Sequence, residues 1–549
     1  MMSKQIDRTE SAHDYPLLIK SMLQAPIVSA PDQEIVYRGK LRFTYRELHA
    51  RVQRLANALT GLGVKPGDTV AIMDYDSHRY LECFFAVPMI GAVLHTINVR
   101  FSPEQILFTI DHAEDDVLLV NADFLPILEQ VKGRLDTVKK FVLLQDEESI
   151  LPRTHIDFAG EYEALLAGAD DMHEFPDFDE NTRATTFYTT GTTGLPKGVY
   201  FSHRQLVLHT LGVLASLASP SVQGRFHRED VYMPITPMFH VHAWGMPYIA
   251  TMMGVKQVYP GRYVPEHLLE LIAQEKVTFS HCVPTILHML LKSPKVDEVD
   301  LSKWKVMIGG AAMSKALCLA AMRRGVDIFT GYGMSETCPI LTISHLQPGQ
   351  LALPDEEQAE IRCKTGVPVP LVDLRTVNER LEDVPRDGKA VGEVVVRAPW
   401  LTQGYLKDTK TSEKLWAGGW LHTSDVAWID AQGYVKITDR TKDVIKIGGE
   451  WISSLELEDV IAAHPAVGEV AVIGMPDEKW GERPLALVVP KPGALGAVKA
   501  REIVRHVVES ADRGTIGKQV VLVKVRLVEA IDKTSVGKIN KVALREKYS

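Results

Sequence analysis

Short apolar runs alternate with longer amphipathic stretches through the first two thirds of the chain. From Thr69 the apolar run VAIMDYD precedes the helix-like stretch SHRYLECFFAVPMIGA, and a second apolar run, VLHTIN, follows. The order recurs from Arg183, where ATTFYTT and GVYFS predict strands. SHRQLVLHTLGVL then predicts a helix that begins with a capping box of Ser202 and Gln205. This alternation predicts mainly parallel sheets covered on both faces, with ligands at the carboxyl ends of the strands.

The pattern changes after about residue 360, where short strands are separated by Gly, Pro and Asp turns. The runs GEVVVRAP and GYVKITD belong to this part and predict a compact β-rich subdomain. The charged run DRTKD at 439–443 has no apolar member and marks the predicted domain boundary. After this run, short apolar stretches and helix-like stretches alternate again, and these residues are numerous enough to form a small α+β module. The predicted fold class is therefore α/β, with a large N-terminal domain of parallel-sheet subdomains and a β-rich subdomain, followed by a small mobile C-terminal domain.

Composition limits the function classes. A chain of 549 residues is too long for a single core, and 46% hydrophobic with 24% charged residues is ordinary for a globular protein. The net charge of −9, without a long basic run, argues against nucleic acid as a partner. A charged N-terminus and the lack of about 18 uninterrupted apolar residues predict a cytoplasmic protein without a membrane span. The scattered cysteines favour reduced thiols over disulfides or zinc.

The stretch YTTGTTGLPKG at 188–198 is too flexible and too polar for a core. Its glycines raise the entropy cost of ordering it, and bound phosphate would offset that cost through backbone N–H groups, threonine hydroxyls and Lys197. A Walker A loop is excluded, because Lys197 is followed by glycine and not by serine or threonine. On these residues alone a phosphate-binding loop and a mobile surface loop remain equally open.

Five segments along the chain carry a recognisable order: YTTGTTGLPKG, YGMSET at 332–337, HTSDV with Asp425, DRTKDVIK from 439 and KTSVGK at 533–538. Their order and rough spacing are those of the adenylate-forming superfamily, and the chain resembles the acyl-CoA synthetases of that group over nearly its whole length. The resemblance implies that a carboxylate attacks the α-phosphate of ATP to give an acyl-adenylate and pyrophosphate. The thiol of coenzyme A then displaces AMP. ATP and coenzyme A are thus the implied co-substrates and Mg²⁺ the implied cofactor.

The resemblance also assigns phosphate and metal contacts. Glu336 corresponds to the Mg²⁺ ligand of the family and Thr337 to its α-phosphate contact, although without the family Glu336 would more often be a surface acid. The glycine-rich loop corresponds to the part that wraps the β- and γ-phosphates, through Thr189, Thr190, Gly191, Thr192, Thr193, Gly194 and Lys197.

The nucleoside contacts follow in the same way. Tyr332 and Gly333 are expected beside adenine, and Asp425 is expected to accept both ribose hydroxyls, since a carboxylate accepts two hydrogen bonds at once. Arg440 is expected to be a second ribose or phosphate contact, with a salt bridge near the domain boundary as the competing interpretation.

The end of the chain corresponds to the mobile part of the family. Lys538 matches the lysine that bridges the carboxylate and the α-phosphate during adenylation, although Asp532 stands where the family usually has proline. Lys442 matches the hinge, 439–442, about which residues 443–549 rotate relative to residues 1–438. After this rotation the thiol channel is expected to be faced by Lys446, Gly448, Gly449, Glu450 and Trp451, and Ile447 replaces a serine that is frequent in the family.

The segment PMFHVHAWG at 237–245 bears on the acid. His240, taken as a catalytic-site residue, stands where amino-acid-activating relatives have an aspartate for the substrate ammonium. A buried ammonium without a carboxylate is costly, so the expected acid lacks an α-amine. The histidine pair around Val241 has no third ligand at an obvious spacing for zinc. Trp244 and Gly309 are expected to wall the acyl pocket, with core packing as the equal alternative for Trp244. The neighbouring Gly310, Ala311 and Ala312 are expected both at this wall and in contact with the nucleotide.

Three functions stay in view at this point. PMFHVHAWGMP and GGEWISSLELE resemble medium-chain acyl-CoA ligases, particularly those that act on 3-methylmercaptopropionate, and favour ligation of a short- or medium-chain acid to coenzyme A. The alternatives are a free-standing adenylation enzyme that loads a carrier protein and a catalytically silent nucleotide-binding protein. Glu336 and Lys538 together argue against the silent protein, because simple binding does not require both. The resemblance also allows a homodimer.

Overall fold

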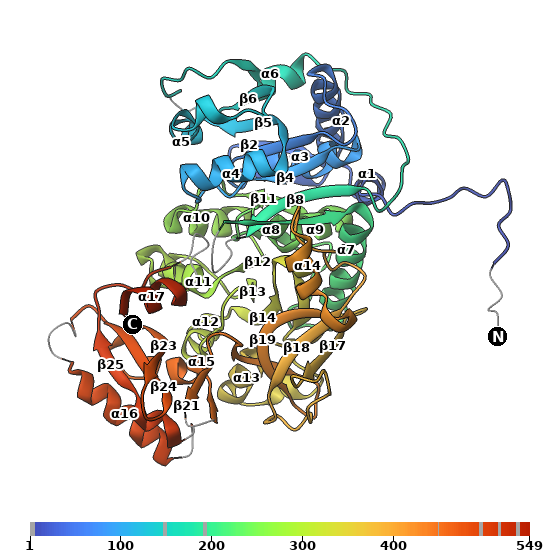
Figure 1. The fold of residues 1–549 in the computed structure, drawn as a ribbon. Helices are drawn as coiled ribbons and strands as arrows, with labels where there is room; N and C mark the ends of the chain where they lie inside the picture. Colours follow the sequence, from blue (N-terminus) through green and yellow to red (C-terminus); the bar gives the residue numbers. More distant parts are fainter. Residues whose placement is uncertain are drawn as a thin grey trace.

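The computed structural model describes residues 6–146, 151–189, 195–447, 450–493, 498–513, 516, 518–533 and 539–548. Its strands form four sheets, of seven, nine, four and five strands. Figure 1 shows the first of these at one end of the molecule, the nine-stranded sheet in the middle, and the C-terminal part, in red, at the other end. Within the described ranges, no helix is both long and apolar enough to cross a membrane.

The seven-stranded sheet has the order β7-β6-β5-β3-β4-β8-β9. All its pairs are parallel except β8 with β9, as the βαβ pattern of the sequence predicts. The capping box of Ser202 and Gln205 is present at the start of α7. The strands are β3 Thr69–Met73, β4 Val93–Thr96, β5 Asp115–Asn121, β6 Lys140–Leu144, β7 Phe158–Glu161, β8 Arg183–Thr189 and β9 Lys197–Ser202, and the helices are α2 Tyr45–Gly61, α3 His78–Met89, α4 Pro103–Ala113, α5 Leu125–Glu129, α6 Tyr162–Ala167 and α7 His203–Ala218.

The nine-stranded sheet has the order β16-β15-β14-β13-β12-β10-β11-β1-β2, and its central pairs are parallel. Antiparallel strands close both edges. The strands are β1 Glu34–Tyr37, β2 Leu41–Thr44, β10 Val231–Pro234, β11 Lys256–Tyr259, β12 Phe279–Cys282, β13 Lys305–Ile308, β14 Asp327–Gly333, β15 Ile340–Ile343 and β16 Val367–Pro368, and the helices are α1 Lys20–Ser29, α8 Val241–Trp244, α9 Met246–Met253, α10 Pro265–Glu275, α11 Pro284–Lys292, α12 Lys315–Met322 and α13 Asp355–Arg362.

The predicted β-rich subdomain is a four-stranded antiparallel sheet. Its last strand runs through the first two residues of the predicted hinge, since Asp439 and Arg440 still pair with β19. A turn at 441–443 follows the strand. The elements are β17 Asp373–Val377, β18 Gly392–Arg397, β19 Leu421–Ile429, β20 Val435–Arg440 and α14 Thr409–Leu415.

The C-terminal part is an α+β unit with its own apolar cores, one of which includes Leu457, Val472 and Val507. It meets the four-stranded sheet where the backbone N–H of Ser454 donates to Asp439 Oδ2 at 2.6 Å. The large parallel-sheet domain and the small C-terminal unit confirm the predicted fold class. The elements are β21 Ile445–Ile447, β22 Glu450–Ile452, β23 Val467–Asp477, β24 Gly481–Pro490, β25 Lys524–Leu527, α15 Ser454–Ala462, α16 Ala500–Asp512 and α17 Lys541–Tyr548.

Candidate active site

The carboxyl end of β14 is the centre of the candidate site. The strand ends at Gly333 and a single 3-10 turn, Ser335–Thr337, follows it. A Cβ atom on Gly333 would lie 1.6 Å from the carbonyl oxygen of Pro339, so only glycine fits there. The buried hydroxyl of Thr337 accepts the backbone N–H of Met334 at 3.0 Å and donates to the carbonyl of Pro339. This close packing fixes the turn that carries the predicted metal ligand and α-phosphate contact.

Tyr332 and Asp425, two residues predicted to contact the nucleoside, lie side by side. The Tyr332 hydroxyl donates to Asp425 Oδ2 at 2.7 Å, and Arg440 Nε lies 3.3 Å from Asp425 Oδ1. Asp425 and Arg440 are paired residues of β19 and β20. Burial and the charge of Asp425 raise the pKa of Tyr332 well above its ordinary value, so the phenol remains a donor.

A second line of contacts joins Glu336 to the strand that follows the glycine-rich loop. The Tyr405 hydroxyl donates to Glu336 Oε1 at 2.6 Å, and Lys197 Nζ lies 4.7 Å from the centre of the Tyr405 ring. The backbone N–H of Leu406 donates to the carbonyl of Gly198 in β9 at 2.8 Å. Burial and the Glu336 carboxylate raise the pKa of Tyr405, which keeps the hydroxyl protonated. The sequence analysis missed Tyr405, and its Gly-Tyr step in the turn LTQGYLKD was the only local signal.

Glu336 is the carboxylate on which a Mg²⁺ site would depend. It is buried, and its oxygens are hard ligands of the kind that Mg²⁺ prefers. Mg²⁺ commonly takes one or two carboxylates and fills its other positions with substrate phosphates and water, so a single acid fits this ion. Among the described side chains, no group of three or more His, Cys, Asp or Glu is placed to hold a metal ion by itself.

The predicted acyl-pocket residues Trp244 and Gly309 also meet. A Cβ atom on Gly309 would lie 2.9 Å from Trp244 Cη2 and 2.8 Å from the carbonyl oxygen of Gly331, the residue before Tyr332. The indole therefore packs on glycine backbone next to the nucleoside residues. Trp244 also lies against His281, with 4.9 Å between ring centres. The next three residues of the predicted wall, Gly310, Ala311 and Ala312, are exposed.

The backbone that leads to Trp244 is unusual. Four consecutive residues, Val241, His242, Ala243 and Trp244, have φ values of 47°, 53°, 47° and 60°. The left-handed region costs an L-residue about 1–2 kcal/mol, so this turn persists only because its surroundings fix it. The ring of His242 is fully buried, and burial lowers its pKa to about 3. His240, whose carbonyl accepts the N–H of Ala243 at 3.1 Å, stands at the start of the turn.

The hinge candidate Lys442 lies in a turn that both domains hold. The backbone N–H of Thr441 donates to the carbonyl of Ser424 at 2.9 Å, which ties the turn to β19. From α17, Arg545 donates to the carbonyl of Lys442 at 3.2 Å and pairs with Asp443 at 2.5 Å. The turn is thus the covalent and polar link between the four-stranded sheet and the C-terminal unit.

Several predicted residues lie outside the described part of the chain: Thr190, Gly191, Thr192, Thr193, Gly194, Gly448, Gly449 and Lys538. Lys446 and Trp451 face each other in the β21–β22 ladder, beside Glu450, but the side chains of these three are likewise outside the description. Thr189 ends β8 and pairs with Lys197. Asp532, at the departure from the family pattern, lies 3.2 Å from Lys547 Nζ.

Comparisons with known proteins show the family of the whole chain. Residues 23–406 match the family model described as AMP-binding enzyme, and residues 456–538 match the AMP-binding enzyme C-terminal domain. A long-chain-fatty-acid–CoA ligase of Thermus thermophilus is 42% identical over 514 residues, which are 92% of this chain and 90% of the relative. A 3-methylmercaptopropionyl-CoA ligase of Ruegeria lacuscaerulensis is 38% identical over 549 residues, 97% of each chain.

Among solved structures, an anthranilate CoA ligase in complex with anthranoyl-AMP shares the fold with a TM-score of 0.83 at 24% identity, over 97% of this chain and 98% of the other. The family model alone covers more than half of the sequence. The chain therefore belongs to the AMP-binding enzyme family, among the acyl-CoA synthetases of the adenylate-forming superfamily.

Proposed function

We propose that the protein joins a short- or medium-chain carboxylic acid to coenzyme A in two steps at the carboxyl end of β14. In the first step a carboxylate oxygen attacks the α-phosphorus of ATP, and pyrophosphate leaves. In the second step the sulfur of coenzyme A attacks the acyl carbon, and AMP leaves. Neither step needs a nucleophile from the protein, so the demands on the chain are alignment and charge neutralisation.

The observation that carries this proposal is that two lines of side-chain contacts, one from Tyr332 and one from Glu336, begin at the end of β14. On one side Tyr332 and Arg440 hold the Asp425 carboxylate, and on the other Tyr405 holds Glu336 beside Lys197. A nucleoside diol needs paired acceptors, and a polyphosphate needs cations. Asp425 in the first line meets the need of the diol, and Lys197 in the second meets that of the polyphosphate. The two lines start only a few residues apart, at the end of β14.

The roles within the site follow from this order. Asp425 would accept the ribose hydroxyls, and the loop that ends at Lys197 would bind the β- and γ-phosphates. Glu336 would hold Mg²⁺, which supplies positive charge to the phosphates when bound. Thr337 would contact the α-phosphate, and Tyr332 would line the adenine side. ATP and the acid would thereby meet between Tyr332 and Trp244.

The acid is proposed from the pocket and from the named relatives. The indole of Trp244 and the backbone of Gly309 form an apolar wall, and His240 replaces the carboxylate that an amino acid would require. Two relatives at 38% identity are named for 3-methylmercaptopropionyl-CoA and one at 37% for medium-chain fatty acids. We therefore propose 3-methylmercaptopropionate or an apolar acid of similar length as the substrate, with a cytoplasmic site of action.

One assay separates this proposal from its alternatives. The protein is incubated with MgATP, a panel of acids from acetate to laurate with 3-methylmercaptopropionate included, and either coenzyme A or a phosphopantetheinyl carrier protein. Release of AMP and pyrophosphate with thioester on coenzyme A supports the ligase. Thioester on the carrier alone supports carrier loading, and ADP as the product contradicts the mechanism.

Two variants test the proposed use of two domain arrangements. Lys538→Ala should abolish acyl-adenylate formation but still convert supplied acyl-adenylate and coenzyme A to thioester, because the charge is needed only in the first transition state. Lys442→Pro restricts the hinge turn and should preserve adenylation while slowing thioester formation. Equal loss of both half-reactions in both variants, with normal thermal unfolding, would contradict the rotating-domain account.

A further inference from the structure

The left-handed turn at Val241–Trp244 needs anchors, and three contacts fix the residues just before it. The backbone N–H of Met238 donates to Asp76 Oδ1 at 2.8 Å. The carbonyl of Phe239 accepts the Thr96 hydroxyl at 3.0 Å, and the Arg100 guanidinium lies 6.0 Å from the centre of the Phe239 ring. Of these three contacts, the one with Asp76 is the hydrogen bond in which an acidic side chain accepts a backbone N–H.

The side chain of His242 does not anchor the turn by hydrogen bonds. Both of its ring nitrogens are buried, and neither has a hydrogen-bond partner in the described chain. The ring instead packs edge-on against Phe84 and Phe187, with centres 5.7 and 5.3 Å away. This packing and the backbone hydrogen bonds within the turn hold its shape, and the polar contacts before it tie the segment to the neighbouring loops.

Asp76 is built to act as a fixed anchor. It lies three residues after β3, is 4% exposed, and its second oxygen accepts the Tyr263 hydroxyl at 2.5 Å. Its carbonyl accepts the backbone N–H of Gly261 at 2.9 Å. One residue thus joins the loops after β3, β10 and β11, at the edge where the two parallel sheets present their carboxyl ends.

The surroundings of Asp76 are compatible with this role near neutral pH. Burial raises its pKa to about 7, while the hydrogen bonds from Tyr263 and Met238 act in the opposite direction. The protonated and the ionised carboxyl both retain an oxygen that accepts the Met238 N–H. The anchor therefore does not depend on the charge of the group.

We infer that Asp76 is a positioning residue that holds segment 237–245 and thereby sets the shape of the acid pocket. This inference rests on the proposed function, in which Trp244 walls that pocket. Asp76 touches neither ATP nor the reacting atoms in this account. Replacement of Asp76 should therefore raise the KM for the acid and leave the KM for ATP nearly unchanged.

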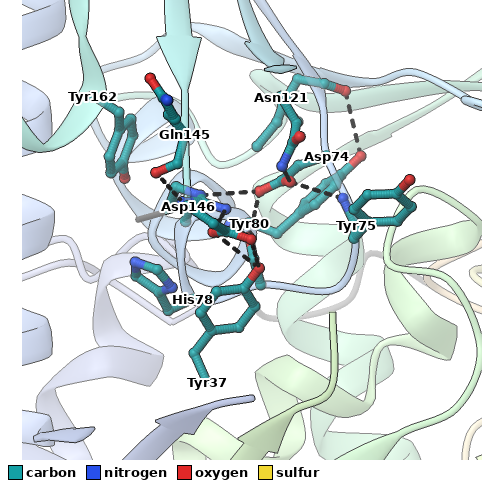
Figure 2. Close-up of polar contacts among 12 residues, drawn as sticks. Tyr37, Asp74, Tyr75, His78, Tyr80, Asn121, Gln145, Asp146 and Tyr162 are labelled. Atoms are coloured by element: carbon teal, nitrogen blue, oxygen red, sulfur yellow. Dashed lines mark hydrogen bonds and ion pairs between the residues drawn. The ribbon is translucent and has the colours of Figure 1, made fainter. Parts of the chain in front are cut away.

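The matched control is Asp74, two residues earlier and equally buried. Figure 2 shows its carboxylate between Asn121, which donates at 2.7 Å, and the backbone N–H of Tyr75, at 2.8 Å. Arg79 Nε lies 3.2 Å from its other oxygen. None of these partners belongs to segment 237–245, so Asp74→Asn perturbs a neighbouring buried carboxylate without releasing Met238.

The test uses hydrogen–deuterium exchange and kinetics on full-length Asp76→Ala, Asp76→Asn, Tyr263→Phe and Asp74→Asn. Peptides that contain 237–245 should exchange faster in Asp76→Ala, to a lesser degree in Tyr263→Phe, and as in the wild type in Asp74→Asn. Asp76→Asn keeps an acceptor oxygen and should largely restore protection. The KM for the best acid should rise about tenfold or more in Asp76→Ala, while the KM for ATP stays within about twofold.

The outcomes are separable. Unchanged exchange of these peptides in Asp76→Ala, or an equal rise of both KM values, would overturn the inference. If Asp76→Ala does not fold, the graded exchange of Tyr263→Phe against Asp74→Asn decides the question. If the wild type releases no AMP with any acid, the proposed function fails, and the exchange comparison still shows whether Asp76 holds the segment.

Discussion

Two clusters in this molecule use the same residue types for different ends. In the first, the Tyr37 hydroxyl donates to Asp146 at 3.0 Å (Figure 2). Arg79 Nη2 lies 2.8 Å from the same carboxylate. In the second, the Tyr332 hydroxyl donates to Asp425 at 2.7 Å and Arg440 lies 3.3 Å away. Tyrosine, aspartate and arginine therefore do not by themselves identify a site.

The difference is in the arginine. The Arg79 side chain is 2% exposed and bridges two carboxylates, because its Nε also reaches Asp74 at 3.2 Å. The Arg440 side chain is 49% exposed, and its Nε lies 3.3 Å from Asp425 Oδ1. A buried cluster in which the arginine pairs with two carboxylates, like that of Arg79, stabilises the fold. In a cluster whose arginine is half-exposed, like that of Arg440, a ligand can replace the weak contact of the arginine.

The largest expected effect breaks the first cluster. Arg79→Ala removes the buried cation that pairs with Asp74 and leaves Asp146 with Arg38, and breaking a buried ion pair costs about 3–5 kcal/mol of stability. Urea unfolding followed by circular dichroism measures the loss. The KM for ATP of the remaining folded protein should equal that of the wild type. A normal unfolding midpoint would show that the cluster is not structural.

The second prediction concerns the other cluster, where a substitution should change the KM for ATP and leave the protein folded. Asp425→Ala removes acceptors for the ribose hydroxyls, and hydrogen bonds to a charged group contribute about 1.5–3 kcal/mol. The KM for ATP should therefore rise roughly ten- to hundredfold. Steady-state AMP release gives the KM, and thermal unfolding checks that the variant is folded. An unchanged KM would mean that Asp425 does not bind ribose.

The third prediction compares the two tyrosines. Tyr37→Phe and Tyr332→Phe each remove one hydroxyl that donates to a carboxylate, an interaction of about 1.5–3 kcal/mol. Tyr37→Phe should lower the free energy of unfolding and leave the KM for ATP unchanged. Tyr332→Phe should raise that KM a few-fold, because Asp425 loses the donor that orients it. The same two assays on both variants test this, and identical responses would abolish the distinction between the clusters.

The sequence predicted the fold class and many of the strands because both leave local signals. The βαβ cadence from Thr69 and the capping box at Ser202 became a parallel sheet and the start of α7. Tyr332 and Asp425, 93 residues apart, were paired only through the family motifs, since no local pattern encodes a contact between β14 and β19.

Other features had no such signal. Tyr405 lies in a turn without periodicity, so its contact with Glu336 appears only when the turn packs against β9. Nor does the string PMFHVHAWG show a left-handed backbone, because only Gly245 in it favours positive φ. Contacts that depend on tertiary packing, such as that of Asp76 with Met238, were beyond the sequence for the same reason.

The smallest expected effect is that of replacing Arg440, whose contact with Asp425 is the weakest in the second cluster. The Arg440 guanidinium is half-exposed and its contact with Asp425 is long, at 3.3 Å, so Arg440→Ala should lower the free energy of unfolding by only about 0.2–1 kcal/mol. The matched control is Arg134, whose exposed guanidinium makes two contacts of 2.8 Å with Glu104 far along the chain from any site candidate. Both variants should have similar stability, but only Arg440→Ala should raise the KM for ATP, about two- to fivefold, since only Arg440 is proposed to contact the nucleotide. An equal KM in the two variants would make Arg440 an ordinary salt-bridge residue and leave Asp425 as the ribose contact without a cationic neighbour.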